Sequence, residues 1–159
     1  MLNAEDVRLC SRALMLLGAP SIASFDDGTD EAALCSTLYQ PTLDDLLVSY
    51  PWKFASAETT LGRLLGTPVA DYAFAYQLPA GLLRVLSAGD GVSSGLTYRI
   101  RERRLETDAA NVTLSYIFRP DESAFPVHFT TALVAKLAAT FALPLTESSQ
   151  RAHTSGARP

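Results

Sequence analysis

Apolar residues recur at helical spacing in three stretches of the chain. The first stretch covers residues 4–17, with Asn3 placed as an N-cap and Gly18 as a stop signal. This pattern predicts a first helix over residues 4–17, because side chains three or four positions apart share one helix face. The predicted buried stripe consists of Val7, Cys10, Leu14 and Leu17.

Two further stretches predict helices over residues 30–49 and 126–143. Pro41 lies inside the first of them, so we expect a kinked helix in two segments, about 30–40 and 41–49. The other stretch begins at Pro126, a residue that the first helical turn tolerates, and we expect it to stop at Pro144. Its apolar residues recur every fourth position, at Phe129, Leu133, Leu137 and Phe141.

Alternation with a period of two replaces the helical spacing over about residues 57–118. We expect Tyr98 and Ile100 to face inward. The predicted fold class is α+β: a bundle of about three to four helices (the first, the kinked second and the C-terminal helix) with an inserted antiparallel β-sheet of about four strands. The expected strands are about 72–78, 82–86, 98–102 and 112–118, the last two forming an antiparallel pair.

A corner of large aromatic residues separates the second helix from this insertion. Pro51 stops the helix, and Trp52, the only tryptophan, and Phe54 follow it. Isolated aromatic pairs usually belong to a core, so we interpret Pro51, Trp52 and Phe54 as a structural hinge. The alternative is a ligand-stacking role.

Composition bounds the class of protein. The 159 residues are 48% hydrophobic and 19% charged, as in a folded domain. We therefore expect a single domain over residues 1–145. Residues 146–159 are small and polar and predict a flexible tail. The net charge of −4 argues against a DNA-binding domain.

The sequence was also compared with the patterns of a signal peptide and a membrane span. The acidic start does not predict a signal peptide, and the apolar window 132–145 is too short to predict a membrane span. We expect a protein made in the cytoplasm. Cys10 and Cys35 lack metal-site spacing and predict buried thiols, with a disulfide between their helices as the alternative.

Catalytic motifs are not found in the sequence. Neither a GxGxxG loop nor a GxSxG elbow is present, and His128 fits a structural role better than a catalytic one. We expect no catalytic, metal-binding or cofactor-binding residues, and no cofactor. The sequence predicts a binding or assembly protein and not an enzyme.

Arginines occupy one face of the predicted strand 98–102. Two interpretations stay open: a solvated edge paired with Glu102 and Glu106, or a contact with a phosphate or an acidic protein partner. The arginines are Arg99, Arg101 and Arg103, with Arg104 close by.

Four segments in order carry a resemblance to a known family. They are residues 13–27 (ALMLLG, then IASFDD), 39–55 (YQP, then LLVSYPWKFA), 72–86 (YAFAYQLP, then LRVL) and 114–138 (LSYI, then FPVHF and LVAKLA). Together they resemble the tail tubular protein A, or head-to-tail adaptor, family of tailed bacteriophages, which also occurs in prophages and gene transfer agents. The resemblance covers about residues 10–146.

This resemblance implies a structural protein of the virion, located at the head–tail junction. Such an adaptor forms a homo-oligomeric ring, a dodecamer, beneath the portal protein. It extends the channel through which double-stranded DNA passes without specific binding, and it carries the tail or a nozzle or stopper protein. No membrane is involved. An acidic wall that does not grip DNA agrees with this role.

The chain departs from the family at two places. Tyr50 stands where the family usually has His, and the region after Leu145 is short and polar. We expect that tail to order on the portal, with Arg151, His153 and Arg158 as candidate portal-binding residues. Arg99, Arg101, Arg103 and Arg104 are the candidates for a subunit or tail interface.

Two alternative functions remain at this point. One is an all-helical head-completion connector, against which the β insertion argues. The other is a small cytoplasmic ligand-binding module that uses Trp52, Phe54 and Tyr76 as a pocket.

Overall fold

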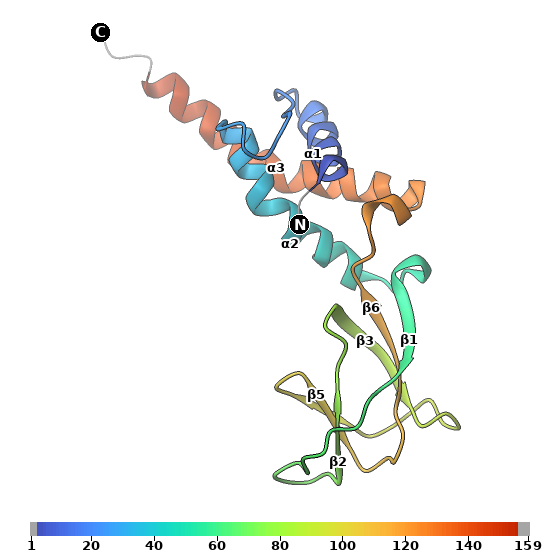
Figure 1. Ribbon diagram of the computed structural model, residues 1–159. Helices are drawn as coiled ribbons and strands as arrows, with labels where there is room; N and C mark the ends of the chain where they lie inside the picture. The colour runs from blue at the N-terminus through green and yellow to red at the C-terminus, as the bar shows by residue number, and fades with distance from the viewer. Residues whose placement is uncertain (1–2, 156–159) are drawn as a thin grey trace. The chain divides into compact units, whose positions relative to one another are not determined.

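The computed structural model describes residues 3–155, and of residues 151–155 only the backbone. Its fold class is α+β, as predicted, with three α-helices and two antiparallel sheets of three strands (Figure 1). The chain divides into two compact units. The helical unit contains the chain up to Leu46 and again from Asp121, and the β unit contains Leu47–Pro120. The expected single domain over residues 1–145 is therefore built from two units.

Helix α1 (Ala4–Leu16) agrees with the prediction to within one residue. Of its predicted stripe, Cys10 and Leu14 are buried and Val7 is half-buried, but the placement of Leu17 is wrong, because Leu17 follows the last turn and is 37% exposed. Asn3 Oδ1 accepts hydrogen bonds from the N–H groups of Glu5 (2.8 Å) and Asp6 (3.2 Å), and Asp6 Oδ2 accepts one from the N–H of Asn3 (2.7 Å). This capping box satisfies donors that the first turn leaves unpaired. After the helix, Gly18 adopts a positive φ of 70°, a conformation that glycine allows without strain.

Helix α2 (Asp30–Ser49) is one continuous helix through Pro41, so the predicted division into two segments is wrong. Pro41 removes one backbone hydrogen bond, but its ring is exposed to solvent. Cys35 and Tyr39 before it and Leu43 after it are all buried on one face. Burial of this face on both sides of the proline outweighs the loss of one hydrogen bond.

Helix α3 (Val127–Ser155) also continues through a proline, which contradicts the predicted stop at residue 143 and, over residues 146–155, the predicted flexible tail; residues 156–159 of that tail lie outside the described residues. Beyond Pro144 the hydroxyl groups of Thr146 and Ser149 donate to the carbonyls of Ala142 (2.8 Å) and Leu145 (2.9 Å). Ser148 Oγ donates to Asp30 Oδ2 of α2 at 3.3 Å. The first two bonds satisfy hydroxyl groups within the helix, and the bond from Ser148 ties this part of α3 to α2, where a composition argument predicts disorder.

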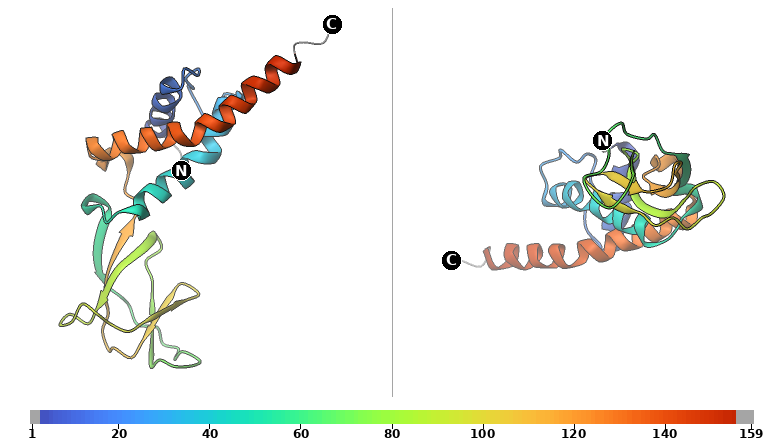
Figure 2. Two further views of the ribbon diagram at one scale, coloured as in Figure 1. Left: turned by 180° about the vertical axis from the view of Figure 1, so that it is seen from behind. Right: turned by 90° about the horizontal axis from the view of Figure 1, so that it is seen from below.

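The long third helix has a buried stripe along one side. The stretch 127–150 has 24 residues and contains an 18-residue window with a mean hydropathy of 1.4, so by length and composition it could cross a bilayer, and the argument that this part of the chain is too short is wrong. The stripe packs inside the helical unit, where α3 contacts α1 in both views of Figure 2. Lys136 forms an ion pair with Asp45 of α2 at 2.6 Å. The apolar residues of the stripe are thus the core of the unit: Phe129, Leu133, Leu137 and Phe141.

The β unit contains six strands, not the predicted four. They form two sheets, with the strand orders β1-β6-β3 and β2-β5-β4. The strands are β1 (Ser56–Thr60), β2 (Phe74–Gln77), β3 (Leu82–Gly89), β4 (Arg99–Arg101), β5 (Arg104–Thr107) and β6 (Thr113–Phe118). Two single-turn 3-10 helices, η1 (Lys53–Ala55) and η2 (Glu122–Ala124), lie outside the sheets.

The strand pairing differs from the prediction. Strand β4 pairs with β5 and not with β6, which pairs with β1 and β3 instead. Strand β1 was missed because its sequence, SAETT, has no apolar alternation, and β5 because it follows a turn without glycine or asparagine. Ile100 was expected to face inward, yet 46% of it is exposed, because the edge strand β4 has only three residues.

The two sheets share one apolar cluster. Tyr76 and Leu105 from one sheet and Ala88 and Leu114 from the other are buried in it, and Tyr98 packs against it as predicted. The hydroxyl of Tyr76 donates to the carbonyl of Ala109 at 2.6 Å. Because this hydroxyl is satisfied inside the core, Tyr76 does not line a ligand cleft.

The aromatic corner is less buried than expected. Trp52 and Phe54 are half-buried, and Pro51 is exposed. The Trp52 ring lies edge-on to Tyr50, with centroids 5.1 Å apart, and 6.1 Å from the Phe54 ring. These residues form an aromatic cluster at the start of the β unit, and their role as a hinge stays a prediction.

Gly89 lies where a side chain would meet backbone. A Cβ added there would clash with the carbonyl oxygen of Ser93, which also accepts the N–H of Asp90 at 3.1 Å. We expect Gly89→Ala to lower the free energy of unfolding by about 1–3 kcal/mol, the usual cost of overpacking. Urea denaturation followed by circular dichroism measures this. Gly62→Ala is the matched control, since no atom lies within 4 Å of its Cβ position.

Candidate functional site

The predicted arginine surface lies on the hairpin formed by β4 and β5. Its strands pair in the register Arg99↔Glu106, Ile100↔Leu105 and Arg101↔Arg104. The side chains of Leu105 and Glu106 are buried, so β5 anchors the hairpin in the β unit. The four arginines therefore share one hairpin, as the sequence predicted, but the hairpin gives them different roles.

Arg99 is a structural residue. Its Nη2 lies 2.6 Å from Glu106 Oε2, and its Nη1 lies 2.9 Å from Asp71 Oδ2. The guanidinium also stands 5.4 Å from the centroid of the Tyr72 ring. The hydrogen bonds to Glu106 and Asp71 raise the pKa of Arg99. This network ties the loop before β2 to the hairpin, and the pairing with Glu106 agrees with the first of the two interpretations.

Arg103 lies in the tight turn that joins the two strands. Glu102 and Arg103 both have positive φ angles, 50° and 61°, as the two central residues of a type I′ turn require. Neither residue type favours this conformation. Arg103 Nη2 donates to the carbonyl of Ala80 at 3.0 Å, and its own carbonyl accepts the N–H of Leu78 at 3.3 Å. Arg103 is thus partly occupied in fixing the turn.

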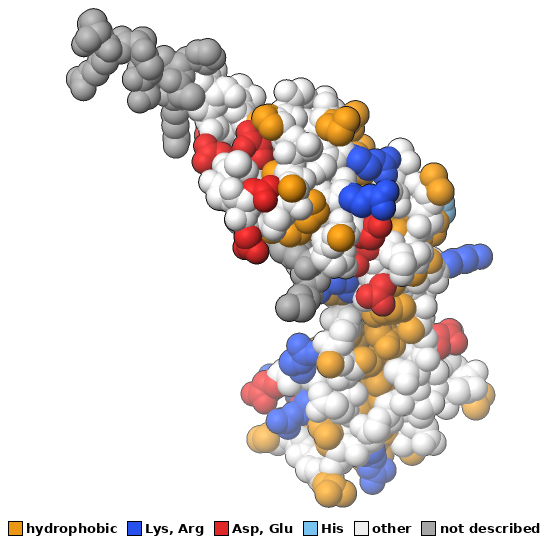
Figure 3. Space-filling model, turned by 45° about the horizontal axis from the view of Figure 1, so that its top comes forward, with side chains coloured by type: hydrophobic (Ala, Val, Ile, Leu, Met, Phe, Trp, Pro, Cys, Tyr) orange, Lys and Arg blue, Asp and Glu red, His pale blue; other side chains and the backbone are white. Residues whose placement is uncertain are grey.

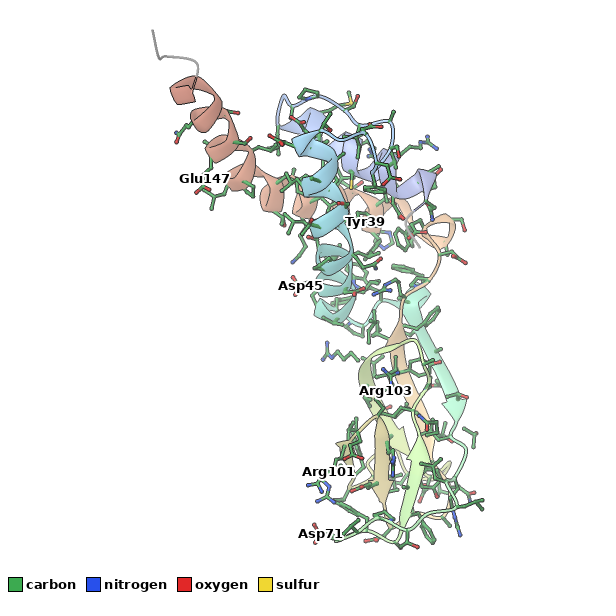
Figure 4. All side chains as sticks on the ribbon, turned by 60° about the vertical axis from the view of Figure 1, so that its left-hand side comes forward. Tyr39, Asp45, Asp71, Arg101, Arg103 and Glu147 are labelled. Carbon is green, nitrogen blue, oxygen red and sulfur yellow. The ribbon has the colours of Figure 1, made fainter. Side chains whose placement is uncertain are left out.

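Arg101 and Arg104 are the exposed charges of the hairpin. They stand opposite one another across the strands, and like charges in this position repel. Arg104 is within 3.8 Å of Glu102, a long ion pair, while Arg101 has no ion pair within the described part of the chain. Figure 4 shows Arg101 pointing away from the strands. Together, Arg101 and Arg104 form what we call the hairpin patch.

The candidate portal-binding residues are not described. Arg151 and His153 belong to the last turns of α3, of which only the backbone is described, and Arg158 lies outside the described residues. Their assignment stays a prediction.

A second candidate surface lies in the helical unit, where the C-terminal half of α1 meets α3. The side chains of Met15 and Leu16 are both 67% exposed and stand beside a groove of about 500 Å³. Arg12 lies at the same groove and has no ion pair among the described residues. The residues that line this α1–α3 groove are Arg12, Met15, Leu16, Thr131, Val134 and Ala135.

Sequence reasoning missed the α1–α3 groove. Its signal was the pair Met15-Leu16, which falls outside the buried stripe of the first helix. A stripe of four residues fills the core side of a helix, so further large apolar residues off the stripe indicate a surface that another molecule covers.

Buried polar groups sit near the centre of the helical unit. Asp6 is 1% exposed and Tyr39 is fully buried, and among the described residues no group lies at hydrogen-bonding geometry to Asp6 Oδ1 or to the Tyr39 hydroxyl. Burial raises the pKa of both groups. Cys10 and Cys35 are free and buried, as predicted, and the contact with Cys35 and burial raise the pKa of the Cys10 thiol. The hydrogen bond with Cys10 lowers the pKa of the Cys35 thiol, and both thiols are shielded from solvent, which argues against a role as nucleophiles.

The raised pKa of Asp6 predicts a dependence of stability on pH. A carboxyl group whose folded pKa exceeds the ordinary 3.8 binds its proton more tightly when folded. Its favourable contribution is therefore complete below pH 3.8 and is lost as the pH rises through the folded pKa. We expect Asp6→Asn, which keeps an oxygen for the N–H of Asn3, to reduce this loss. Urea unfolding at a series of pH values, with Asp26→Asn as the exposed control, measures the difference.

Among the residues whose side chains are described, no group of three or more His, Cys, Asp or Glu residues is arranged to hold a metal ion. The groove offers apolar area beside the charge of Arg12, and the hairpin patch offers exposed positive charge; both suit protein contacts. A comparison with protein-family models and with curated proteins found no match to this sequence.

Proposed function

We propose that this chain is a structural protein of a phage-like particle: a head-to-tail adaptor that forms a ring beneath the portal. In this role it extends the DNA channel and gives the tail a platform for attachment. The observation that carries the proposal is the α1–α3 groove, where Met15 and Leu16 expose apolar surface next to the unpaired Arg12. An exposed apolar patch with a polar rim is typical of a surface that another protein covers.

The hairpin patch gives the adaptor a second contact surface. Arg101 and Arg104 repel one another in the free chain, and an acidic partner relieves that repulsion. We assign this patch to the neighbouring subunit or to the tail protein. Arg99 and Arg103, which hydrogen-bond within the β unit, support the patch and are not its main contacts.

Reversing the exposed charges tests the hairpin patch. We expect the double substitution Arg101→Glu and Arg104→Glu to prevent attachment of the tail or assembly of the ring while the chain stays folded. Electron microscopy of the purified chain, with and without a portal ring, measures assembly. Lys53→Glu is the control, since it reverses an exposed charge away from the hairpin. Normal particles from the double variant would remove the patch from the interface.

A variant of the hairpin turn tests the strain in the turn while it leaves Arg101 and Arg104 unchanged. Replacing Glu102 by Asn and Arg103 by Gly gives the residue pair that type I′ turns prefer. We expect the free energy of unfolding to rise by about 1–2 kcal/mol, because the two left-handed residues are no longer strained. Thermal denaturation followed by circular dichroism measures this gain. An unchanged or lower stability would show that the Arg103–Ala80 hydrogen bond outweighs the strain.

A further inference from the structure

The chemistry of the α1–α3 groove defines which kind of side chain could bind in it. The groove has apolar walls from Met15, Leu16 and Val134, with one positive charge, Arg12, at its edge. Arg8, one helical turn before Arg12, already forms an ion pair with Glu5 at 2.8 Å. An apolar side chain next to a carboxylate would therefore suit this surface. The apolar group would contact the walls of the groove, and the carboxylate would pair with Arg12.

The chain itself carries such a segment, in the link between α1 and α2. Phe25 is half-buried there, and Asp26 next to it is exposed, with no ion pair among the described residues. Asp27 is occupied, since its Oδ2 accepts the N–H groups of Ala23 (2.7 Å) and Ser24 (3.0 Å). These bonds fix the loop, so Phe25 and Asp26 are presented by a defined structure and not by a free strand.

The two surfaces are separate parts of the helical unit. Phe25 and Asp26 lie beside the N-terminal end of α1, with Asn3, Ala4 and Val7, whereas the groove lies beside its C-terminal half. They share no residue. In Figure 3 several acidic side chains gather at one side of the helical unit and a group of basic side chains lies at the other, with hydrophobic and acidic side chains also beside the basic group.

We propose that the groove binds a second copy of this chain, with Phe25 of that copy against Met15 and Leu16 and its Asp26 paired with Arg12. This contact rests on the self-assembly part of the proposed function and names the surfaces that carry it. Because two different surfaces meet, the contact is head-to-tail, and repeated head-to-tail contacts close into a ring when the rotation between copies allows it. Charge complementarity selects the second copy as the occupant.

An exchange of charge between the two surfaces tests the contact. The variants are Arg12→Glu, Asp26→Arg and the double variant, with Lys53→Glu as control. Association is measured by sedimentation velocity over a range of concentrations and by electron microscopy on portal rings. We expect each single variant to raise the concentration needed for half-maximal association at least about tenfold, since like charges then face one another. The double variant should restore association, because the pair forms again with reversed polarity.

The outcomes separate this inference from the proposed function. If rings form and neither single variant weakens them, or if the double variant does not recover, the contact is wrong while the adaptor function stands. If the wild-type chain stays monomeric at every concentration and on portal rings, both are overturned. Circular dichroism of each variant shows that the fold is intact, which we expect because Arg12 and Asp26 are exposed.

Discussion

Phe129→Ala should lower the free energy of unfolding of the helical unit by about 3–5 kcal/mol. Phe129 is fully buried in the first turn of α3, and its ring meets that of Phe125 edge-on at 4.9 Å. Truncation removes apolar area and leaves a cavity that the helices on either side fill only in part. It also loses the ring contact, worth about 0.5–1.5 kcal/mol in such pairs. Urea unfolding followed by the helical circular dichroism signal measures the loss.

The same helix turn supplies the control for this substitution. Val127 is 84% exposed, so Val127→Ala should change stability by less than about 0.5 kcal/mol. If Phe129→Ala proved equally mild, the assignment of the Phe129 stripe to the core would be wrong. Helix α3 would then need another explanation for its apolar character.

Leu105→Ala should destabilise the β unit by about 2–5 kcal/mol. Leu105 is fully buried in the cluster between the two sheets, opposite Tyr76 on β2 and Ile100 on β4. It is the apolar anchor of the hairpin, so its loss should also loosen the pairing that presents Arg101 and Arg104. Fluorescence of Trp52, which belongs to the same unit, reports the unfolding of the β unit.

Val92→Ala is the matched control in the β unit, since Val92 is 98% exposed. A further readout connects this prediction to the proposed function. If Leu105→Ala weakens assembly at temperatures where the unit is still folded, a rigid hairpin is required for the contact. A neutral Leu105→Ala would contradict the position of β5 between β2 and β4.

Helix positions could be predicted from the sequence because the helical period needs only neighbouring residues. The stripe of Phe129, Leu133, Leu137 and Phe141 identified the core side of α3 correctly. Helix ends were less predictable. Pro41 and Pro144 indicate breaks locally, yet both helices continue. In α2, burial of residues on each side of Pro41 outweighs the missing hydrogen bond. Beyond Pro144 the described side chains are half-buried or exposed, and Ser148 bonds to Asp30 of α2.

Strand pairing could not be predicted in the same way. Alternation shows that a segment is a strand, but it does not show which strand lies beside it. Strand β5 carries buried Leu105, Glu106 and Thr107 in succession, a sequence that contains no alternation. The Glu102–Arg103 turn that creates this strand has none of the residues typical of its type.

The sequence by itself determined the α+β class, the buried stripe of α3, the buried thiols and the location of the arginines. Each of these depends on the order of residue types within one segment. The tertiary structure alone decided which arginines are structural, since the partners of Arg99 and Arg103 come from distant residues, Asp71 and Ala80. It also revealed the α1–α3 groove, because a groove between two helices exists only when both are packed in place.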